Sequence, residues 1–388
     1  MIGKQLFLET TELDGALEIV NETIGYAEGL HRSGTLRPAF YDDVLLLAAE
    51  ILRHVENQGE WIDLGYQICR EFKQTMERCG CRDQPSMLSG LGYRCFAVRE
   101  FCEQTHLLPG FSRSMDHLLF IAVDHKVEQA RKEPTLAENY DMLRGISGTL
   151  YYLLDCDCTR EEKKILVKCI QYLLTLDQKA FRDGSLRLGL AHGMLGPLIA
   201  LAKACAKGFV VDGLQEGIEK LFRLYEIHQS VEEDNIPCWP EVITVEEDWE
   251  KACRPEHLHR SFSWCDGNLG ILRGLQKVSA YMNWPQRERA YLQAMKGFLA
   301  QDIKAYSFDG PSLCHGYSGL VAVQTGTYSV YEDPGLFTNL ERNVKEVIKG
   351  YRTNNQQDLS LLTGSLGITV ALLSLQGRVR ASNLLMID

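Results

Sequence analysis

The step Gly-x-x-Gly recurs along this chain of 388 residues and constrains its fold more than any other feature. Its first glycines are Gly145, Gly193, Gly267, Gly316 and Gly364, and a shorter version, Gly90-Leu91-Gly92, precedes them. Apart from one longer interval, between Gly193 and Gly267, the steps are evenly spaced. Their period of roughly 50 residues has room for two helices and two connections, so the sequence predicts repeated helical hairpins.

Each glycine step is followed by an apolar run with helical character, and the stretches between these runs are amphipathic. The apolar runs are 149–154, 197–204, 271–278, 320–323 and 368–375; 160–176 and 285–299 are amphipathic. Glycines at i and i+3 remove two β-carbons from one helix face, so that neighbouring backbones can approach closely. We therefore expect an all-α fold, an α/α toroid of six or seven hairpins with inner apolar and outer amphipathic helices. The glycine ends should gather at one mouth.

The longer interval between Gly193 and Gly267 interrupts the period. After a helix expected at 214–228, residues 231–260 indicate a small irregular arm in which 242–244 resembles a strand. Residues 1–84 show amphipathic helices, such as 42–55, and residues 85–388 bear the repeats. Because no linker or low-complexity tract divides them, we expect a single domain over 1–388.

The composition of the chain limits the classes of partner and the cellular location that we expect. A formal net charge of −11 argues against nucleic acid as the main partner; it suits solubility, with a basic peptide partner as the alternative. No stretch approaches the roughly 20 apolar residues of a membrane span, and the start lacks a signal-peptide profile. Thirteen cysteines without a compact framework fit reduced thiols. We expect a cytoplasmic protein without membrane insertion, with peripheral attachment to a membrane-associated complex left open.

Metal-ligating and proton-transferring side chains directly precede three of the glycine steps. Cys314 and His315 precede Gly316, Cys265 lies two residues before Gly267, and His192 precedes Gly193. Two thiolates and an imidazole suit zinc, and three protein ligands leave a fourth position open for a substrate. The sequence therefore predicts one zinc ion per chain, held by Cys265, Cys314 and His315.

Four segments together resemble, in order, the signature motifs of the lanthionine synthetase C-like cyclases. They are Tyr140 to Gly148, Ala191-His192-Gly193, Trp264-Cys265-x-Gly267 and Cys314-His315-Gly316, and the resemblance covers roughly residues 85 to 375. It implies an α/α toroid that closes thioether rings in a dehydrated precursor peptide consisting of leader and core. It also implies zinc at the three ligands and a catalytic pair, His192 and Asp141. A separate dehydratase and an exporter in a biosynthetic complex are the implied protein partners.

The chemistry of these residues is coherent. Zinc lowers the pKa of a coordinated thiol, so a peptide cysteine could bind the open position as a thiolate. That thiolate would add to the β-carbon of dehydroalanine or dehydrobutyrine. His192 can accept the thiol proton or protonate the α-carbon, and Asp141 can orient the imidazole. The alternative for Asp141 is a helix cap.

The sequence departs from the family pattern after the first zinc cysteine. Asp266 stands where the family usually has tyrosine, and Arg260 is offset by one residue from the family's arginine. We expect Asp266, Arg260 and Trp264 to contact substrate, with packing at the mouth as the alternative for Trp264. These departures concern ring closure and leave the zinc ligands intact.

Other candidate features have simpler interpretations. The pairs Cys79/Cys81 and Cys156/Cys158 lack zinc-finger spacing and are taken as incidental. His257 and His259 are taken as solvated loop residues, with contact to substrate as the alternative. The acidic runs 232–234 and 246–248 are interpreted as a solvated face, with attraction of a basic peptide as the alternative.

Two other functions remain open at this point. The chain could add a small thiol such as glutathione to dehydroamino acids, with thiol alkylation of the prenyltransferase type as a more distant enzyme. It could also be a non-catalytic, zinc-containing scaffold that binds peptide and assists a dehydratase.

Overall fold

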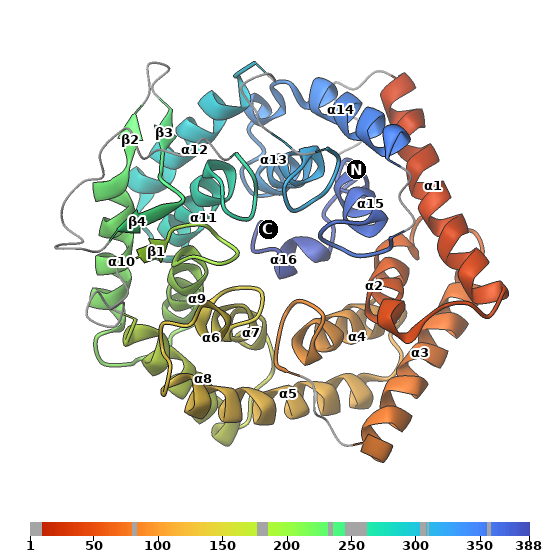
Figure 1. Cartoon of the computed structure of the whole chain (residues 1–388), viewed down its shortest axis with the longest axis horizontal. Coiled ribbons are helices and arrows are strands. Elements are labelled where there is room, and N and C mark those ends of the chain that lie inside the picture. The colour runs from red at the N-terminus through yellow and green to blue at the C-terminus, as the bar shows by residue number, and fades with distance from the viewer. Residues whose placement is uncertain are drawn as a thin grey trace. The chain divides into compact units, whose positions relative to one another are not determined.

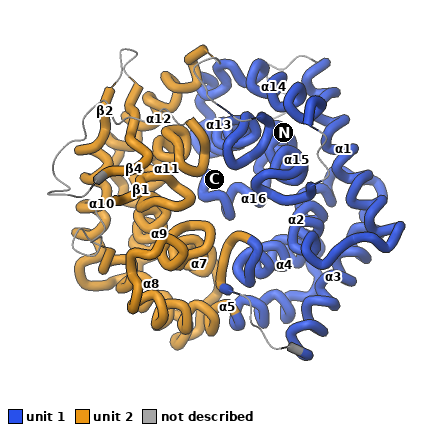
Figure 2. The backbone as a smooth tube through the Cα atoms, in the orientation of Figure 1, with its two compact units in different colours: residues 1–84, 89–118, 308–388 blue, residues 85–88, 119–307 orange. Residues whose placement is uncertain are grey.

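The computed structural model describes residues 10–79, 84–176, 185–231, 236–244, 262–302, 308, 310–354 and 358–388, most of them in helices (Figure 1). Its contacts divide the chain into two compact units, which Figure 2 colours separately. Unit 1 comprises Met1–Gln84, Ser89–Leu118 and Phe308–Asp388, and unit 2 comprises Pro85–Leu88 and Leu119–Ser307.

Unit 1 is built on a row of buried helices. The row runs α4 (Leu91–Thr105), α2 (Tyr41–Ile51), α15 (Ser365–Leu373) and α13 (Tyr317–Tyr331), each packed against the next (Figure 1). The amphipathic helices α1 (Thr10–Arg32), α3 (Gln58–Cys79) and α14 (Leu340–Thr353) pack against this row. Short helical turns complete the unit: η2 (Pro38–Phe40), η5 (Pro334–Phe337) and α16 (Ala381–Leu384).

Unit 2 repeats the same arrangement. The buried helices α7 (Ile146–Leu153), α9 (Leu195–Ala206) and α11 (Asn268–Tyr281) pack side by side in that order (Figure 1). Against them pack the amphipathic helices α8 (Arg160–Leu174), α10 (Leu214–His228) and α12 (Pro285–Leu299). The short α6 (Ala137–Tyr140) precedes α7, and α5 (Pro109–Ala130) begins in unit 1 and ends in unit 2. The alternation of buried and amphipathic helices is confirmed for the helices that follow the glycine steps. The helix expected at 42–55 is not amphipathic: it is α2, which ends at Ile51 and is buried from Asp42 to Ile51. With α2, the described residues contain seven buried helices.

Glycine is needed where a loop crosses closely over the first turn of a buried helix, as it does at α7 and α11. A β-carbon on Gly270 would lie 1.9 Å from the carbonyl oxygen of Trp264, and one on Gly148 equally close to that of Met142. These distances are far below van der Waals contact, so only glycine allows the loop to pass there. The repeated step therefore positions the residues that precede it.

The irregular arm contains short strands. Strand β1 (Ser185–Arg187) pairs antiparallel with β4 (Val242–Thr244), with Leu186 opposite Ile243. Strand β2 (Ser230–Val231) pairs with β3 (Pro237–Cys238). The strand predicted at 242–244 is confirmed, whereas β1 has too few residues to show a periodicity in the sequence. The acidic runs 232–234 and 246–248, and Arg260, His257 and His259, lie outside the described residues.

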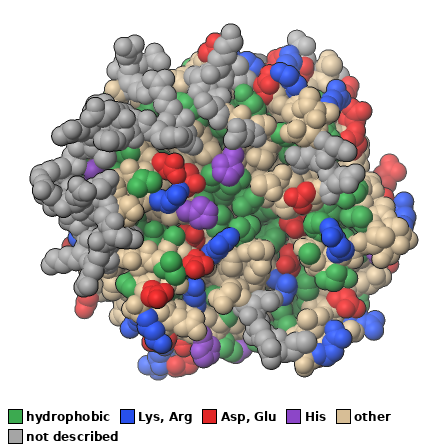
Figure 3. Space-filling view, viewed as in Figure 1, with side chains coloured by type: hydrophobic (Ala, Val, Ile, Leu, Met, Phe, Trp, Pro, Cys, Tyr) green, Lys and Arg blue, Asp and Glu red, His purple; other side chains and the backbone are tan. Residues whose placement is uncertain are grey.

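Among the described helices, none combines the length and the apolar character needed to cross a bilayer. Figure 3 shows acidic and basic side chains of the described residues interspersed on the face in view. The single domain predicted over 1–388 stays a prediction: both compact units are discontinuous in sequence, and α5 runs from one into the other.

Candidate functional site

The loops before the buried helices share one hydrogen-bonding frame. Five of them have serine or aspartate four residues before the first glycine: Ser86, Asp141, Ser263, Ser312 and Ser360. In three loops this side chain accepts the backbone N–H of the residue just before the glycine. The distances are 2.7 Å from Arg144, 3.4 Å from Asp266 and 3.3 Å from His315. Each loop is therefore closed on itself by a short polar side chain.

Neighbouring loops are also bonded to one another through the residue two before the first glycine. The N–H of Ala191 donates to the carbonyl of Cys265 at 2.8 Å in unit 2. The N–H of Cys314 donates to the carbonyl of Leu362 at 3.0 Å in unit 1. It follows that Cys265 and Cys314 occupy equivalent positions, as do His192, Asp266 and His315, which come immediately before the glycine.

His192 and Asp141 are paired in unit 2. The imidazole Nδ1 lies 2.8 Å from Asp141 Oδ2, and 39% of the His192 side chain is exposed. The hydrogen bond to Asp141 is the main cause that raises the pKa of His192 above 6.5; burial opposes it, and the charges of Asp141, Asp266 and Cys265 add to it. With Nδ1 occupied by the carboxylate, the imidazole can present Nε2 to a ligand. This geometry suits proton transfer.

Asp141 performs two tasks at once. Its Oδ1 accepts the backbone N–H groups of Arg144 and Gly145, at 2.7 and 2.8 Å, just before α7 begins, while Oδ2 contacts His192. The side chain is 1% exposed. The sequence offered helix capping as the alternative to orientation of histidine. Here Oδ1 closes the loop before α7 and bonds no N–H group of the helix itself, while Oδ2 contacts His192.

Cys265 and its neighbours lie in the next loop of unit 2. Cys265 is buried, and its Sγ lies 3.4 Å from Ser263 Oγ. Asp266 packs against Gly189, where a β-carbon would meet its Oδ1 at 2.6 Å. Trp264 is also buried, which agrees with packing. Substrate contact by Trp264, Asp266 and Arg260 stays a prediction.

Cys314 and His315 lie together in unit 1. Cys314 is buried and His315 is exposed. Cys314 Sγ lies 3.9 Å from His315 Nε2. Two ligands of one tetrahedral zinc ion, at roughly 2.3 and 2.0 Å from it, are separated by about 3.6 Å. The two side chains therefore have almost the spacing that a shared ion requires.

Among the described residues, the group of side chains that could hold a metal ion consists of Cys265, Cys314 and His315, each with one ligand atom. Cys156 and Cys158 belong to no such group among the residues that the structure describes. Cys158 Sγ donates to the carbonyl of Cys156, and the side chains of Cys79 and Cys81 lie outside the description. No disulfide joins the cysteines whose side chains are described.

Two serines that support the cysteine loops were missed by the sequence analysis. Ser263 contacts Cys265 Sγ and the N–H of Asp266, and Ser312 accepts the N–H of His315. The signal was present as Ser-x-Cys in both loops, with Asp141 at the equivalent position in a third. Aligning the repeats residue by residue would have found it.

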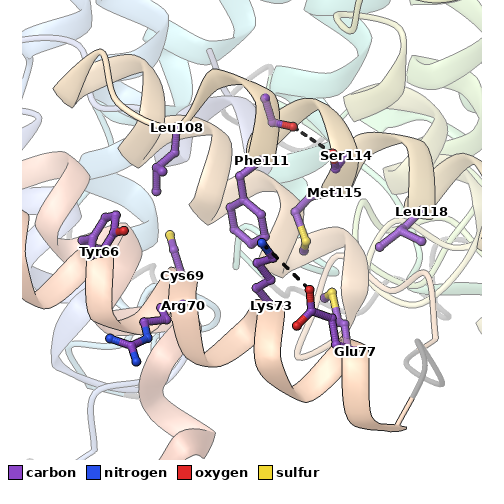
Figure 4. A pocket seen from close by; sticks show the side chains of 12 residues that line it. Tyr66, Cys69, Arg70, Lys73, Glu77, Leu108, Phe111, Ser114, Met115 and Leu118 are labelled. Atoms are coloured by element: carbon purple, nitrogen blue, oxygen red, sulfur yellow. Dashed lines mark hydrogen bonds and ion pairs between the residues drawn. The ribbon is translucent and has the colours of Figure 1, made fainter.

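A separate groove lies between α3 and the start of α5 in unit 1 (Figure 4). It has a volume of about 570 Å³ and is lined by apolar side chains such as Phe111, Met115 and Leu118. Lys73 at its edge is paired with Glu77. The groove contains none of the residues predicted to act on substrate.

The fold and the site define a helical-repeat protein that carries a histidine–aspartate pair and thiolate and imidazole metal donors. The chain belongs to the lanthionine synthetase C-like protein family, whose family model matches residues 44–386.

Comparison with individual proteins agrees with this family assignment. The chain is 26% identical over 266 residues to the nisin biosynthesis protein NisC of Lactococcus lactis subsp. lactis, a match that spans 61% of each protein. It is similar to the solved structure of nisin cyclase with a TM-score of 0.77 and 18% identity, over 89% of this chain and 90% of that one. This similarity confirms the predicted α/α toroid fold.

Proposed function

We propose that this protein is a zinc-dependent lanthipeptide cyclase, which adds a peptide cysteine to a dehydroamino acid in the same peptide. One observation carries the proposal. The loop that holds His192 against Asp141 is hydrogen-bonded, through Ala191, to the loop of Cys265 at 2.8 Å. A proton-transfer group and a candidate thiolate ligand are thereby fixed in neighbouring loops, and family membership supports the assignment.

Cys265, Cys314 and His315 are the residues that would hold zinc. Their donor set of two thiolates and one imidazole suits this ion, and the 3.9 Å between Cys314 Sγ and His315 Nε2 is close to the spacing of two shared ligands. Zinc bound there would lower the pKa of a substrate thiol at the fourth position. Two thiolate ligands would keep that sulfur nucleophilic rather than favour activation of water.

The reaction balances without an oxidant or a reductant. The substrate S–H bond and the π bond of the dehydroamino acid break, while one bond forms between sulfur and the β-carbon and another between hydrogen and the α-carbon. The proton that the thiol loses is thus matched by the proton that the α-carbon gains. His192 is placed to move the proton at Nε2, because Asp141 occupies Nδ1. The raised pKa of His192 favours the protonated imidazole, which can donate a proton to the α-carbon.

Ring closure is tested with a dehydrated peptide that contains cysteine. Because the reaction leaves mass unchanged, the readout is the loss of free thiol, measured by alkylation. We expect His192→Ala to slow this loss by roughly 10²- to 10⁴-fold. His125→Ala removes an exposed histidine of the same unit and should leave the rate unchanged. If wild type and His192→Ala consume thiol equally, the proposed role of His192 is wrong.

Metal content is tested separately. We expect about one zinc ion per wild-type chain and its loss in Cys314→Ala, because two ligands bind far more weakly than three. Zinc retained in full by Cys314→Ala would exclude the proposed ligand set. Zinc bound without any consumption of thiol would favour the scaffold function, and consumption only after added glutathione would favour the small-thiol enzyme.

The proposed substrate requires an earlier reaction that removes water from serine and threonine. We propose that a separate dehydratase supplies it. The exporter and the cytoplasmic location stay predictions. Binding of a dehydratase to this chain can be measured by pull-down with and without the precursor peptide.

A further inference from the structure

The loop of residues 358–364 holds the backbone of Cys314 in unit 1. The N–H of Cys314 donates to the carbonyl of Leu362 at 3.0 Å. The absence of a β-carbon on Gly367 lets this region pack tightly, since one would lie 1.9 Å from the carbonyl of Leu361 and 2.9 Å from Cβ of Leu313. The position of Cys314 therefore depends on what fixes this loop.

In unit 2, the corresponding loop before α7 is fixed by the next loop along the chain. Met142, three residues before its glycine, donates its N–H to the carbonyl of Ala191 at 3.2 Å. Leu361 is the equivalent residue of the last repeat, and its N–H donates to a side chain, the carboxylate Oδ1 of Asp43, at 3.2 Å. Asp43 lies in the first turn of α2, which is preceded by η2 and not by a glycine step. A carboxylate thus replaces the missing loop carbonyl.

Asp43 is held for this contact. The hydroxyl of Tyr93 donates to Asp43 Oδ1 at 2.7 Å, and both side chains are buried. The adjacent Asp42 is the carboxylate that pairs with Arg94, at 3.0 Å. Burial, together with the charges of Asp42 and Asp358, raises the pKa of Asp43 to about 7 against the opposing hydrogen bonds from Tyr93 and Leu361. A buried carboxyl is costly unless its hydrogen bonds compensate.

We propose that Asp43 is a positioning residue for the metal centre. It fixes the 358–364 loop through the N–H of Leu361, and that loop fixes Cys314 through the carbonyl of Leu362. The inference rests on the proposed function in one respect, that Cys314 and His315 bind zinc. Part of the zinc affinity is thereby assigned to Asp43, a side chain on α2 that is far from Cys314 in the sequence.

The experiment compares Asp43→Leu, which removes the acceptor, with Asp43→Asn, which keeps Oδ1. Zinc affinity is measured by competition with a chromophoric chelator, and the absorption of the cobalt-substituted protein reports thiolate geometry. We expect about tenfold weaker zinc binding and a shifted thiolate-to-cobalt band in Asp43→Leu. Asp43→Asn should stay within about threefold of wild type, on the same reasoning. Asp42→Asn is the matched control and should leave both readouts unchanged.

Unchanged affinity and spectrum in Asp43→Leu would overturn the inference, as would equal losses in the leucine and asparagine variants. If Asp43→Leu fails to fold, Asp43→Ser, which is too short to reach Leu361, takes its place with the same expected results. Failure of the proposed function looks different, because wild type itself would then bind no zinc. If wild type binds zinc and the Asp43 variants bind it equally well, only the proposed role of Asp43 is wrong.

Discussion

At the scale of single residues, the site depends on which oxygen or nitrogen of each group is already occupied. Asp141 uses Oδ1 to close the loop before α7 and Oδ2 to hold Nδ1 of His192. The same loop position carries serine before Cys265 and Cys314, where a hydroxyl closes the loop. Aspartate at this position in one repeat provides a second oxygen, and that oxygen contacts histidine.

We therefore expect Asp141→Asn to lower the pKa of His192, since the carboxylate is the main cause of its elevation. Asparagine keeps an oxygen for the N–H groups of Arg144 and Gly145, so the loop should stay closed. Imidazole chemical shifts measured by NMR against pH report the change. Asp266→Asn should shift the pKa in the same direction by less, because Asp266 acts through its charge alone.

The raised pKa of His192 also makes stability depend on pH. A histidine with a higher pKa in the folded state contributes stability fully below its unfolded value of 6.5 and loses it as pH rises through the folded value. The stability difference between wild type and Asp141→Asn should therefore be larger at pH 5.5 than at pH 9. Urea denaturation at both values measures it, and a difference that grows with pH would contradict the pairing.

At the scale of helices, the glycine step determines how closely a loop can cross the first turn of α7, α11 and α15. The second glycine of the step is the tight position at Gly148, Gly270 and Gly367, each with a carbonyl oxygen 1.9 Å from the missing β-carbon. Gly25 inside α1, in contrast, has no neighbour within 4 Å of its missing β-carbon. The two kinds of glycine should respond oppositely to substitution.

Gly367→Ala should destabilise the protein by about 1–3 kcal/mol, because the loop must move away from α15. Gly25→Ala should stabilise it by up to about 1 kcal/mol through helix propensity alone. Both positions belong to unit 1, so one denaturation experiment compares them. Equal effects of the same sign would show that close approach does not determine the requirement for glycine.

At the scale of the whole molecule, segments far apart in sequence are joined through buried carboxyl groups. Glu50 in α2 accepts the N–H groups of Arg380 and Ala381, at 3.1 and 2.7 Å, and so holds the start of α16. Arg380 in turn pairs with Glu100 of α4. The C-terminal segment after Arg380 is almost entirely buried, so these bonds fix the end of the chain in unit 1.

Burial raises the pKa of Glu50 from 4.5 to about 7. Between these values the folded state binds more protons than the unfolded state, so stability falls as pH rises and is constant above about 7. Glu50→Gln removes this dependence while keeping an oxygen acceptor. We expect its stability relative to wild type to increase from pH 4 to pH 8 in urea denaturation, and a decrease would show that the carboxylate is favoured in the folded state.

Much of the fold and the family of this protein could be predicted from its sequence alone. The spacing of the glycine steps predicted a helical repeat, and the apolar runs after them predicted the buried helices, because both signals are local and periodic. The family resemblance followed from four short motifs in order, and the family is confirmed. The helix at 285–299 begins and ends where predicted, since Pro285 suits a first turn.

Only the tertiary structure showed which atoms meet. The sequence left pairing with histidine and helix capping as alternatives for Asp141, because the choice depends on where His192 lies, 51 residues later. Strand β1 could not be predicted from the sequence for the same reason, since its pairing with β4 joins segments that are distant along the chain. Asp43 belongs to no motif that could be recognised in the sequence. Its role arises because Leu361 needs an acceptor, and folding brings the two together across 318 residues.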